Sequence, residues 1–181
     1  CQGPTQAETI TGVVNHGQVK KFPIVVYIDE VQGLTSAPPV SHPEMDQKNK
    51  EFTPRVLPVS VGSTVNFLNG DTIKHNVMSP DNERFDLGNA PPAKMLSYTF
   101  NNPGVYTMLC RVHPEMIGYV VVVNTPYFGV TDRKGNFRIE NVPPGRYRLR
   151  LWGEKLKPAQ LSKNFPVTVE GGKGASAEIK P

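Results

Sequence analysis

The chain has 181 residues, with 20 Lys and Arg against 16 Asp and Glu, so its formal net charge is +4. This length allows one large or two small domains with a real core. Its longest apolar run, 119–123, has the length of a strand and is too short to span a membrane. The basic excess lies in residues 126–181, which carry 11 Lys and Arg against 5 Asp and Glu, or +6. No stretch combines basic and aromatic residues in the manner of a nucleic-acid-binding surface, which argues against that class.

The sequence pattern predicts an all-β protein. Valine-rich alternating runs are separated by turns that use many of the 18 Pro and 16 Gly. The expected strands are 9–15, 24–31, 56–61, 64–68, 94–100, 105–109 and 119–124. The polar segments 42–51 and 79–93 are predicted to be mostly loop.

One window concentrates metal-binding side chains. Cys110, His113 and Met116 form a C-x-x-H-x-x-M run after a predicted strand. A thiolate, an imidazole and a thioether are donor types of a blue-copper site, which needs a second His. His75, at the start of another predicted strand, supplies it. The residues therefore predict a mononuclear site with His75, Cys110 and His113 as equatorial ligands and Met116 as the axial ligand.

Zinc is the main alternative metal, because a Cys and two His also bind it. Structural zinc sites take a further Cys or His as the fourth ligand. The fourth donor here is the thioether of Met116, which favours copper.

Residues 38–124 resemble a cupredoxin, and specifically the amicyanin-like variety with a short ligand loop. The resemblance is carried by His75-Asn76-Val77 and by the run from Cys110 to Met116. It implies a Greek-key β-sandwich of eight strands that holds one type-1 copper. It also implies that Asn76 hydrogen-bonds toward the cysteine loop and braces it. Glu115 departs from the family pattern, which has an apolar residue in this loop.

We expect His75 to be buried and His113 to expose an edge at the end of the domain. That edge, with Glu115 and Ile117 beside it, is the predicted port for electrons and the docking surface for a partner. The expected partner is a redox protein such as a c-type cytochrome or an envelope oxidoreductase.

The tail has a different resemblance. Residues 127–139 and 142–149 are similar to the second half of a carboxypeptidase-regulatory-like, transthyretin-type β-sandwich, and Asp-x-x-Gly and Pro-Pro-Gly turns support a hairpin there. Residues 10–14 and 24–28 fit its first half. Because a few strands alone are marginally stable, we expect one discontinuous sandwich of 9–37 plus 125–181, with the cupredoxin of 38–124 inserted in it or packed beside it.

The first residue, Cys1, is where a bacterial lipoprotein carries its lipid after signal-peptide removal. With residues 1–8 as a flexible tether, this predicts a lipid-anchored protein of the periplasm or cell surface that touches the membrane only through that anchor.

Three other features of the sequence bear on alternatives to an electron carrier with one copper site. The tetrapeptide at His42 repeats that at His113 and could mark a second metal site, but it lacks a cysteine. Three scattered methionines, Met78, Met95 and Met108, could serve a copper-delivery module without redox turnover. A copper enzyme is disfavoured, because only four histidines are present. We therefore expect a non-enzymatic electron carrier.

Overall fold

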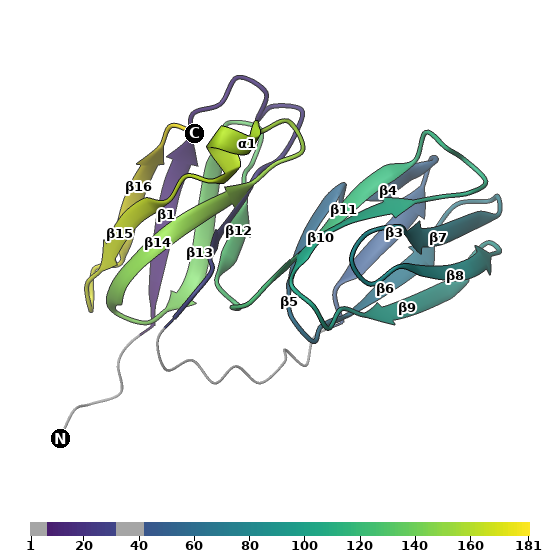
Figure 1. Ribbon diagram of the computed structural model, residues 1–181, viewed down its shortest axis with the longest axis horizontal. Coiled ribbons are helices and arrows are strands. Elements are labelled where there is room, and N and C mark those ends of the chain that lie inside the picture. Colours follow the sequence, from purple (N-terminus) through teal and green to yellow (C-terminus); the bar gives the residue numbers. More distant parts are fainter. Residues whose placement is uncertain (1–6, 32–41) are drawn as a thin grey trace. The chain divides into compact units, whose positions relative to one another are not determined.

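The computed structural model describes residues 7–31 and 42–181, so Cys1 and most of the expected tether lie outside the described residues. The described chain is built of β-strands with one four-residue helix, α1 (Pro158–Leu161), which confirms the all-β class (Figure 1). It divides into two compact units, one combining 7–31 with Tyr127–Pro181 and the other spanning 42–126. Within these residues no helix is both long and apolar enough to cross a membrane.

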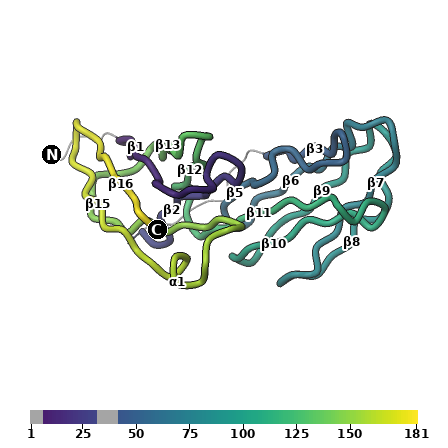
Figure 2. The backbone as a smooth tube through the Cα atoms, turned by 90° about the horizontal axis from the view of Figure 1, so that it is seen from above, coloured from purple at the N-terminus to yellow at the C-terminus, as the bar shows by residue number. Residues whose placement is uncertain are grey.

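The first unit is a β-sandwich made from both ends of the described chain. One sheet has the order β13-β1-β16 and the other β12-β2-β14-β15. Strand β1 pairs antiparallel with β13 and parallel with β16, and both views place the purple N-terminal strand beside these later strands (Figures 1 and 2). The strands are β1 (Glu8–Val14), β2 (Val25–Ile28), β12 (Phe128–Val130), β13 (Asn136–Val142), β14 (Gly145–Trp152), β15 (Phe165–Val169) and β16 (Ala175–Ile179).

The core of this unit depends on both segments. Ile10 and Val14 from β1 are buried in the same apolar cluster as Phe137, Leu149 and Ile179 from the C-terminal segment. Without β1 and β2, strands β13 and β16 would lose the strand between them, and so would β12 and β14. The N-terminal strands therefore complete a sandwich that the tail cannot form by itself.

The second unit also contains two sheets, ordered β5-β11-β10-β7-β8 and β4-β3-β6-β9. Most neighbouring strands are antiparallel, whereas β5 pairs parallel with β11 and β3 pairs parallel with β6. Its core includes Phe67, Phe100 and Tyr106, which are fully buried. The strands are β3 (Glu44–Lys48), β4 (Glu51–Thr53), β5 (Val56–Ser60), β6 (Thr64–Asn69), β7 (His75–Ser79), β8 (Phe85–Ala90), β9 (Met95–Thr99), β10 (Gly104–Leu109) and β11 (Ile117–Val123).

Two segments predicted as loop are strands, and this corrects the sequence analysis. Residues 42–51 contain β3 and the start of β4, because Met45 and Gln47 alternate into the interior while the charged neighbours face outward. Residues 79–93 contain β8, where only Phe85 and Ala90 are buried and the residues between them are exposed or half-buried. With these strands the described part of the unit has nine, one more than the resemblance implied.

Candidate metal centre

The loop between β10 and β11 holds Cys110 at one end and Met116 at the other. Leu109 ends β10 and pairs with Ile117, which begins β11, so the loop leaves and re-enters one antiparallel ladder. Cys110 is 3% exposed and Met116 1% exposed, and both belong to the apolar core of the unit. The backbone N–H of Met116 donates to the carbonyl of His113 at 3.0 Å, which closes a turn around the half-buried His113.

His75 brings its imidazole to the same end of the unit as Cys110, but from the hairpin of β7 and β8. It is the first residue of β7, which lies between β10 and β8 in the five-stranded sheet, and its side chain is fully buried. The loop before it is fixed by Asn69, whose Nδ2 donates to the carbonyls of Ile73 and Ala90, both at 2.8 Å. The expected burial of His75 and partial exposure of His113 are therefore observed.

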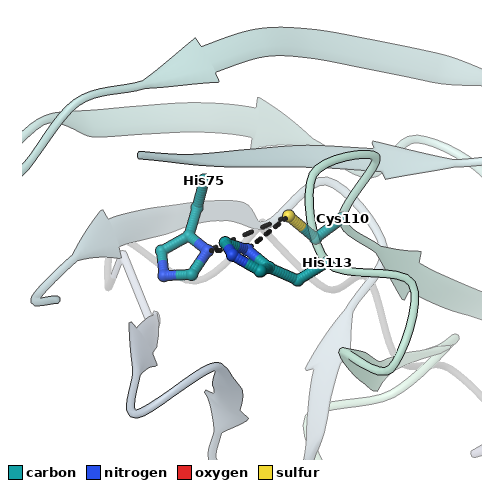
Figure 3. Close-up of side chains that lie close together, drawn as sticks. All are labelled: His75, Cys110 and His113. Carbon is teal, nitrogen blue, oxygen red and sulfur yellow. Dashed lines mark hydrogen bonds between the residues drawn. The ribbon is translucent and has the colours of Figure 1, made fainter. Parts of the chain in front are cut away.

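Three donor atoms converge at this end of the unit. The Nδ1 atoms of His75 and His113 are 3.1 Å apart, and each is 3.9 Å from the Sγ atom of Cys110 (Figure 3). Three atoms so separated all lie about 2.1 Å from a common point, and metal bonds to imidazole nitrogen and thiolate sulfur are about 2.0 to 2.3 Å long. In residues 7–31 and 42–181 no other group of His, Cys, Asp and Glu side chains is arranged to hold a metal ion.

A carboxylate sets the orientation of the buried histidine. The Oδ2 atom of Asp71 lies 3.1 Å from Nε2 of His75. The hydrogen bond with His75, together with backbone N–H groups of Lys50 and Thr72, holds the pKa of Asp71 below its ordinary value. An ionised carboxylate only accepts hydrogen bonds, so Nε2 of His75 is the donor in this pair. The other ring nitrogen, Nδ1, faces Cys110 and His113.

Asn76 ties the two halves of the site together. Its backbone N–H donates to Sγ of Cys110 at 3.4 Å, and its Oδ1 accepts from the backbone N–H of Arg111 at 3.3 Å. Its Nδ2 donates to Oδ1 of Asp86 at 2.8 Å and to the carbonyl of Gly88 at 2.9 Å. The hydrogen bond from Asn76 to Asp86, together with one from the backbone N–H of Gly88, holds the pKa of Asp86 below its ordinary value. The cysteine loop is thus braced from β7 and β8.

The surface beside His113 mixes polar and apolar side chains. Glu115 is exposed and Ile117 is half-buried. Val112 is 40% exposed, and Ile73, in the loop before His75, is 37% exposed. The ligand loop therefore offers an apolar residue on one side of His113 and a carboxylate on the other.

The remaining sequence candidates do not join the site. In the tetrapeptide that begins at His42, Met45 is fully buried in the apolar core and His42 itself is exposed. Met108 is buried in the core and Met95 is 44% exposed. In the described chain the repeated tetrapeptide forms no second group of His, Cys, Asp and Glu that could hold a metal ion.

Two residues that contact the site were missed from the sequence. Asp71 precedes His75 by four residues in a turn, where aspartate usually bonds only to local backbone. Gln47 is fully buried in β3 and donates from Nε2 to the carbonyl of Asn76 at 3.0 Å. A carboxylate close in sequence to a candidate ligand was the one available signal for Asp71. Nothing in the sequence pointed to Gln47.

The comparisons with known proteins each match part of the chain. A curated relative, an amicyanin from Paracoccus versutus, is 34% identical over 82 residues. The match covers 42% of this chain and 60% of that protein, so this chain spans less than two thirds of it. Part of this chain is therefore similar to a cupredoxin. The C-terminal residues 122–177 match a family model described as polysaccharide lyase family 4, domain II. The carboxypeptidase-regulatory-like resemblance of the flanking sandwich is not confirmed.

Solved structures overlap with part of the chain. A purple cupredoxin from Nitrosopumilus maritimus is 25% identical with a TM-score of 0.42, covering 44% of this chain and 98% of that one. A copper-containing nitrite reductase from Thermus scotoductus is 23% identical with a TM-score of 0.45, covering 63% of this chain and 28% of that one.

Proposed function

We propose that this protein is a type-1 copper protein that carries single electrons between redox partners in the bacterial cell envelope. The observation that carries the proposal is the convergence of His75, Cys110 and His113, from two separate hairpins, on one point at metal-bond distance. The sequence similarity to an amicyanin supports the same assignment.

The donor set fits copper. Two imidazoles and a thiolate are the equatorial ligands of blue-copper sites, and a thioether is their weak axial ligand. Met116, buried in the same apolar core as Cys110, is the chain's candidate for that fourth position. A bound copper ion would supply one-electron chemistry by alternating between Cu(I) and Cu(II).

The protein's own contribution is to fix the positions of the ligands and to shield them from water. His75 and Cys110 are buried. Asp71 bonds the imidazole of His75, and the backbone N–H of Asn76 donates to Sγ of Cys110. A frame that fixes the donors leaves little reorganisation between oxidation states, which suits repeated electron transfer. His113 alone of the three is half-buried, so its exposed edge is the port we propose for electrons.

The proposal also covers where the protein lies in the cell and which redox partner it meets. A lipid at Cys1 would place the protein in the envelope, where a c-type cytochrome or an envelope oxidoreductase is the expected partner. Labelling cells with a palmitate analogue tests the lipid: Cys1→Ser should lose the label and keep the copper site.

The test of the copper assignment is a titration of metal-free protein with Cu(II). We expect one equivalent to bind and to produce an intense visible band from thiolate-to-copper charge transfer. The band should bleach on reduction and return on oxidation. Cys110→Ala should abolish it, whereas Cys1→Ser, which alters the other cysteine, should leave it unchanged. His113→Ala should weaken it and His42→Ala should not.

Two outcomes would count against the proposal. A colourless complex would favour a site built for zinc. A coloured complex that cannot be cycled would favour copper storage or delivery without redox turnover.

A further inference from the structure

The outward face of β14 carries three arginines in a row. Arg146, Arg148 and Arg150 alternate with residues that face the interior, among them Leu149 and Leu151, both buried in the core. From sequence alone such alternation is explained by a solvated strand face. The structure shows that this face is hollowed.

A cavity of about 800 Å³ lies over this part of the first unit. The side chains that line it and matter here are Asp29, Arg146, Arg148, Arg150, Asn164 and Pro166. Arg148 pairs across the sheet with Pro166 of β15, and Arg150 pairs with Tyr27 of β2, so the arginines cross the middle of the four-stranded sheet. The volume is within the range of small-molecule sites, about 300 to 1,000 Å³.

The charges in the cavity are unevenly compensated. Arg150 is paired with Asp29, with Nη1 2.8 Å from Oδ2. The side chains of Arg146 and Arg148 are exposed and make no ion pair or hydrogen bond within the described chain. Glu30 also lines the cavity, so its local charge is three positive against two negative. The two unpaired guanidinium groups therefore leave a local positive potential.

The chemistry of these groups selects the ligand. A guanidinium presents a planar fork of N–H donors that matches the two oxygens of a carboxylate or phosphate. Alternate residues on a strand are about 6.6 to 6.8 Å apart, so two such forks can grip separate groups of one molecule. The amide of Asn164 adds a neutral donor and acceptor at the wall.

We propose that this cavity binds a small anionic molecule that carries carboxylate or phosphate groups, with Arg146 and Arg148 as its principal contacts. Arg150, held by Asp29, is the less available third cation. The site lies wholly on the first unit and is independent of the copper assignment.

The test uses the full chain, with citrate and inorganic phosphate as probes and sucrose as a neutral control. Trp152, the chain's single tryptophan, follows on the same strand and on the same face as the arginines, so its fluorescence can report binding. Calorimetry gives the stoichiometry. We expect saturable one-to-one binding of citrate that weakens with added salt.

Two double variants distinguish binding at this cavity from a general effect of the protein's net charge. Arg146→Gln with Arg148→Gln should weaken citrate binding at least tenfold. The control, Arg133→Gln with Lys134→Gln, removes the same charge from a turn elsewhere in the unit and should change it less than twofold. Asp29→Asn removes a negative charge and frees Arg150, so it should tighten binding.

The relative affinities identify the ligand's anionic group. If citrate binds more tightly than phosphate, the natural ligand is assigned as a polycarboxylate. If phosphate binds more tightly, it is assigned as a phosphate ester. The proposal is overturned if neither anion binds saturably, if sucrose binds as well as citrate, or if both double variants weaken binding equally.

Discussion

Asp71 and His75 form a carboxylate–imidazole pair, with Oδ2 and Nε2 3.1 Å apart, in which the imidazole is fully buried and its other nitrogen faces Cys110 and His113. Carboxylates that bond the outer nitrogen of a ligating histidine fix its orientation and raise its basicity. This pair makes the turn before β7 part of the candidate metal centre.

Replacing Asp71 by Asn should loosen that centre without destroying it. The neutral amide removes a negative charge, so Cu(I) is favoured and the reduction potential should rise. Loss of such an outer partner typically weakens metal binding by about 10 to 100-fold. Voltammetry and competition with a chelator measure the two effects. Glu115→Gln, which removes a charge from the ligand loop and spares His75, should leave the copper affinity unchanged. An unchanged affinity in Asp71→Asn would show that the pair is incidental.

Asn76 should be worth more to the fold than an ordinary polar residue. Its side chain satisfies the backbone N–H of Arg111, the carboxylate of Asp86 and the carbonyl of Gly88. Asn76→Ala removes these three hydrogen bonds, and an ordinary hydrogen bond contributes about 0.5 to 1.5 kcal/mol to stability. Urea unfolding of metal-free protein should show a loss in this range or above it.

The matched control is Ser97→Ala, which removes an exposed side-chain hydrogen bond to Asn66. It should cost less than about 0.5 kcal/mol, as surface substitutions usually do. Equal losses in the two variants would contradict the bracing role of Asn76.

The sequence predicted the metal-binding side chains of this site but not all of the residues that contact it. Cys110 and His113 could be proposed because few side chains bind soft metals and these two are close in sequence. His75 could be proposed because a blue-copper site needs a second histidine and the chain has only four. Asp71 and Gln47 could not, since an aspartate in a turn and a glutamine in a polar segment have common local explanations. Their roles depend on hairpins that meet only in three dimensions.

The strands that were missed have a related cause. Buried and less buried residues alternate along β3, as in a strand. Because the buried Gln47 is polar, the sequence does not show the alternation of apolar and polar residues that identifies a strand. In β8 only Phe85 and Ala90 are buried, and the pairing with β7 shifts register between Asn76 and Met78. The strands predicted correctly, such as β10 and β11, have apolar residues at buried positions.

Gly12 tests whether β1 is essential to the first unit. A Cβ atom there would overlap the carbonyl oxygen of Ala177 in β16 and lie 2.6 Å from the ring of Phe137 in β13. Gly12→Ala should therefore separate β1 from a neighbouring strand and cost about 1 to 3 kcal/mol or more. Thermal unfolding measures the loss. Gly17→Ala is the control, because nothing lies within 4 Å of its added Cβ atom. If both variants unfold alike, β1 is not tightly packed between its neighbours.

Asp132 gives the first unit a dependence on acid pH. Its carboxylate accepts from Nδ2 of Asn136 at 2.9 Å and from the backbone N–H groups of Asn136 and Lys134 at 2.9 and 2.8 Å. These bonds, led by that of the Asn136 side chain, hold the pKa of Asp132 below its ordinary value of 3.8.

Because the folded pKa is depressed, the unfolded chain takes up the proton first as pH falls. The stabilisation is therefore complete above about pH 3.8 and is lost as pH falls through the folded value. Asp132→Asn should lower stability at pH 6 and show a smaller further loss between pH 5 and pH 3 than the natural protein does. Urea midpoints across this range measure it. Parallel curves for the two proteins would mean that the turn at β13 draws no stability from the charge of Asp132.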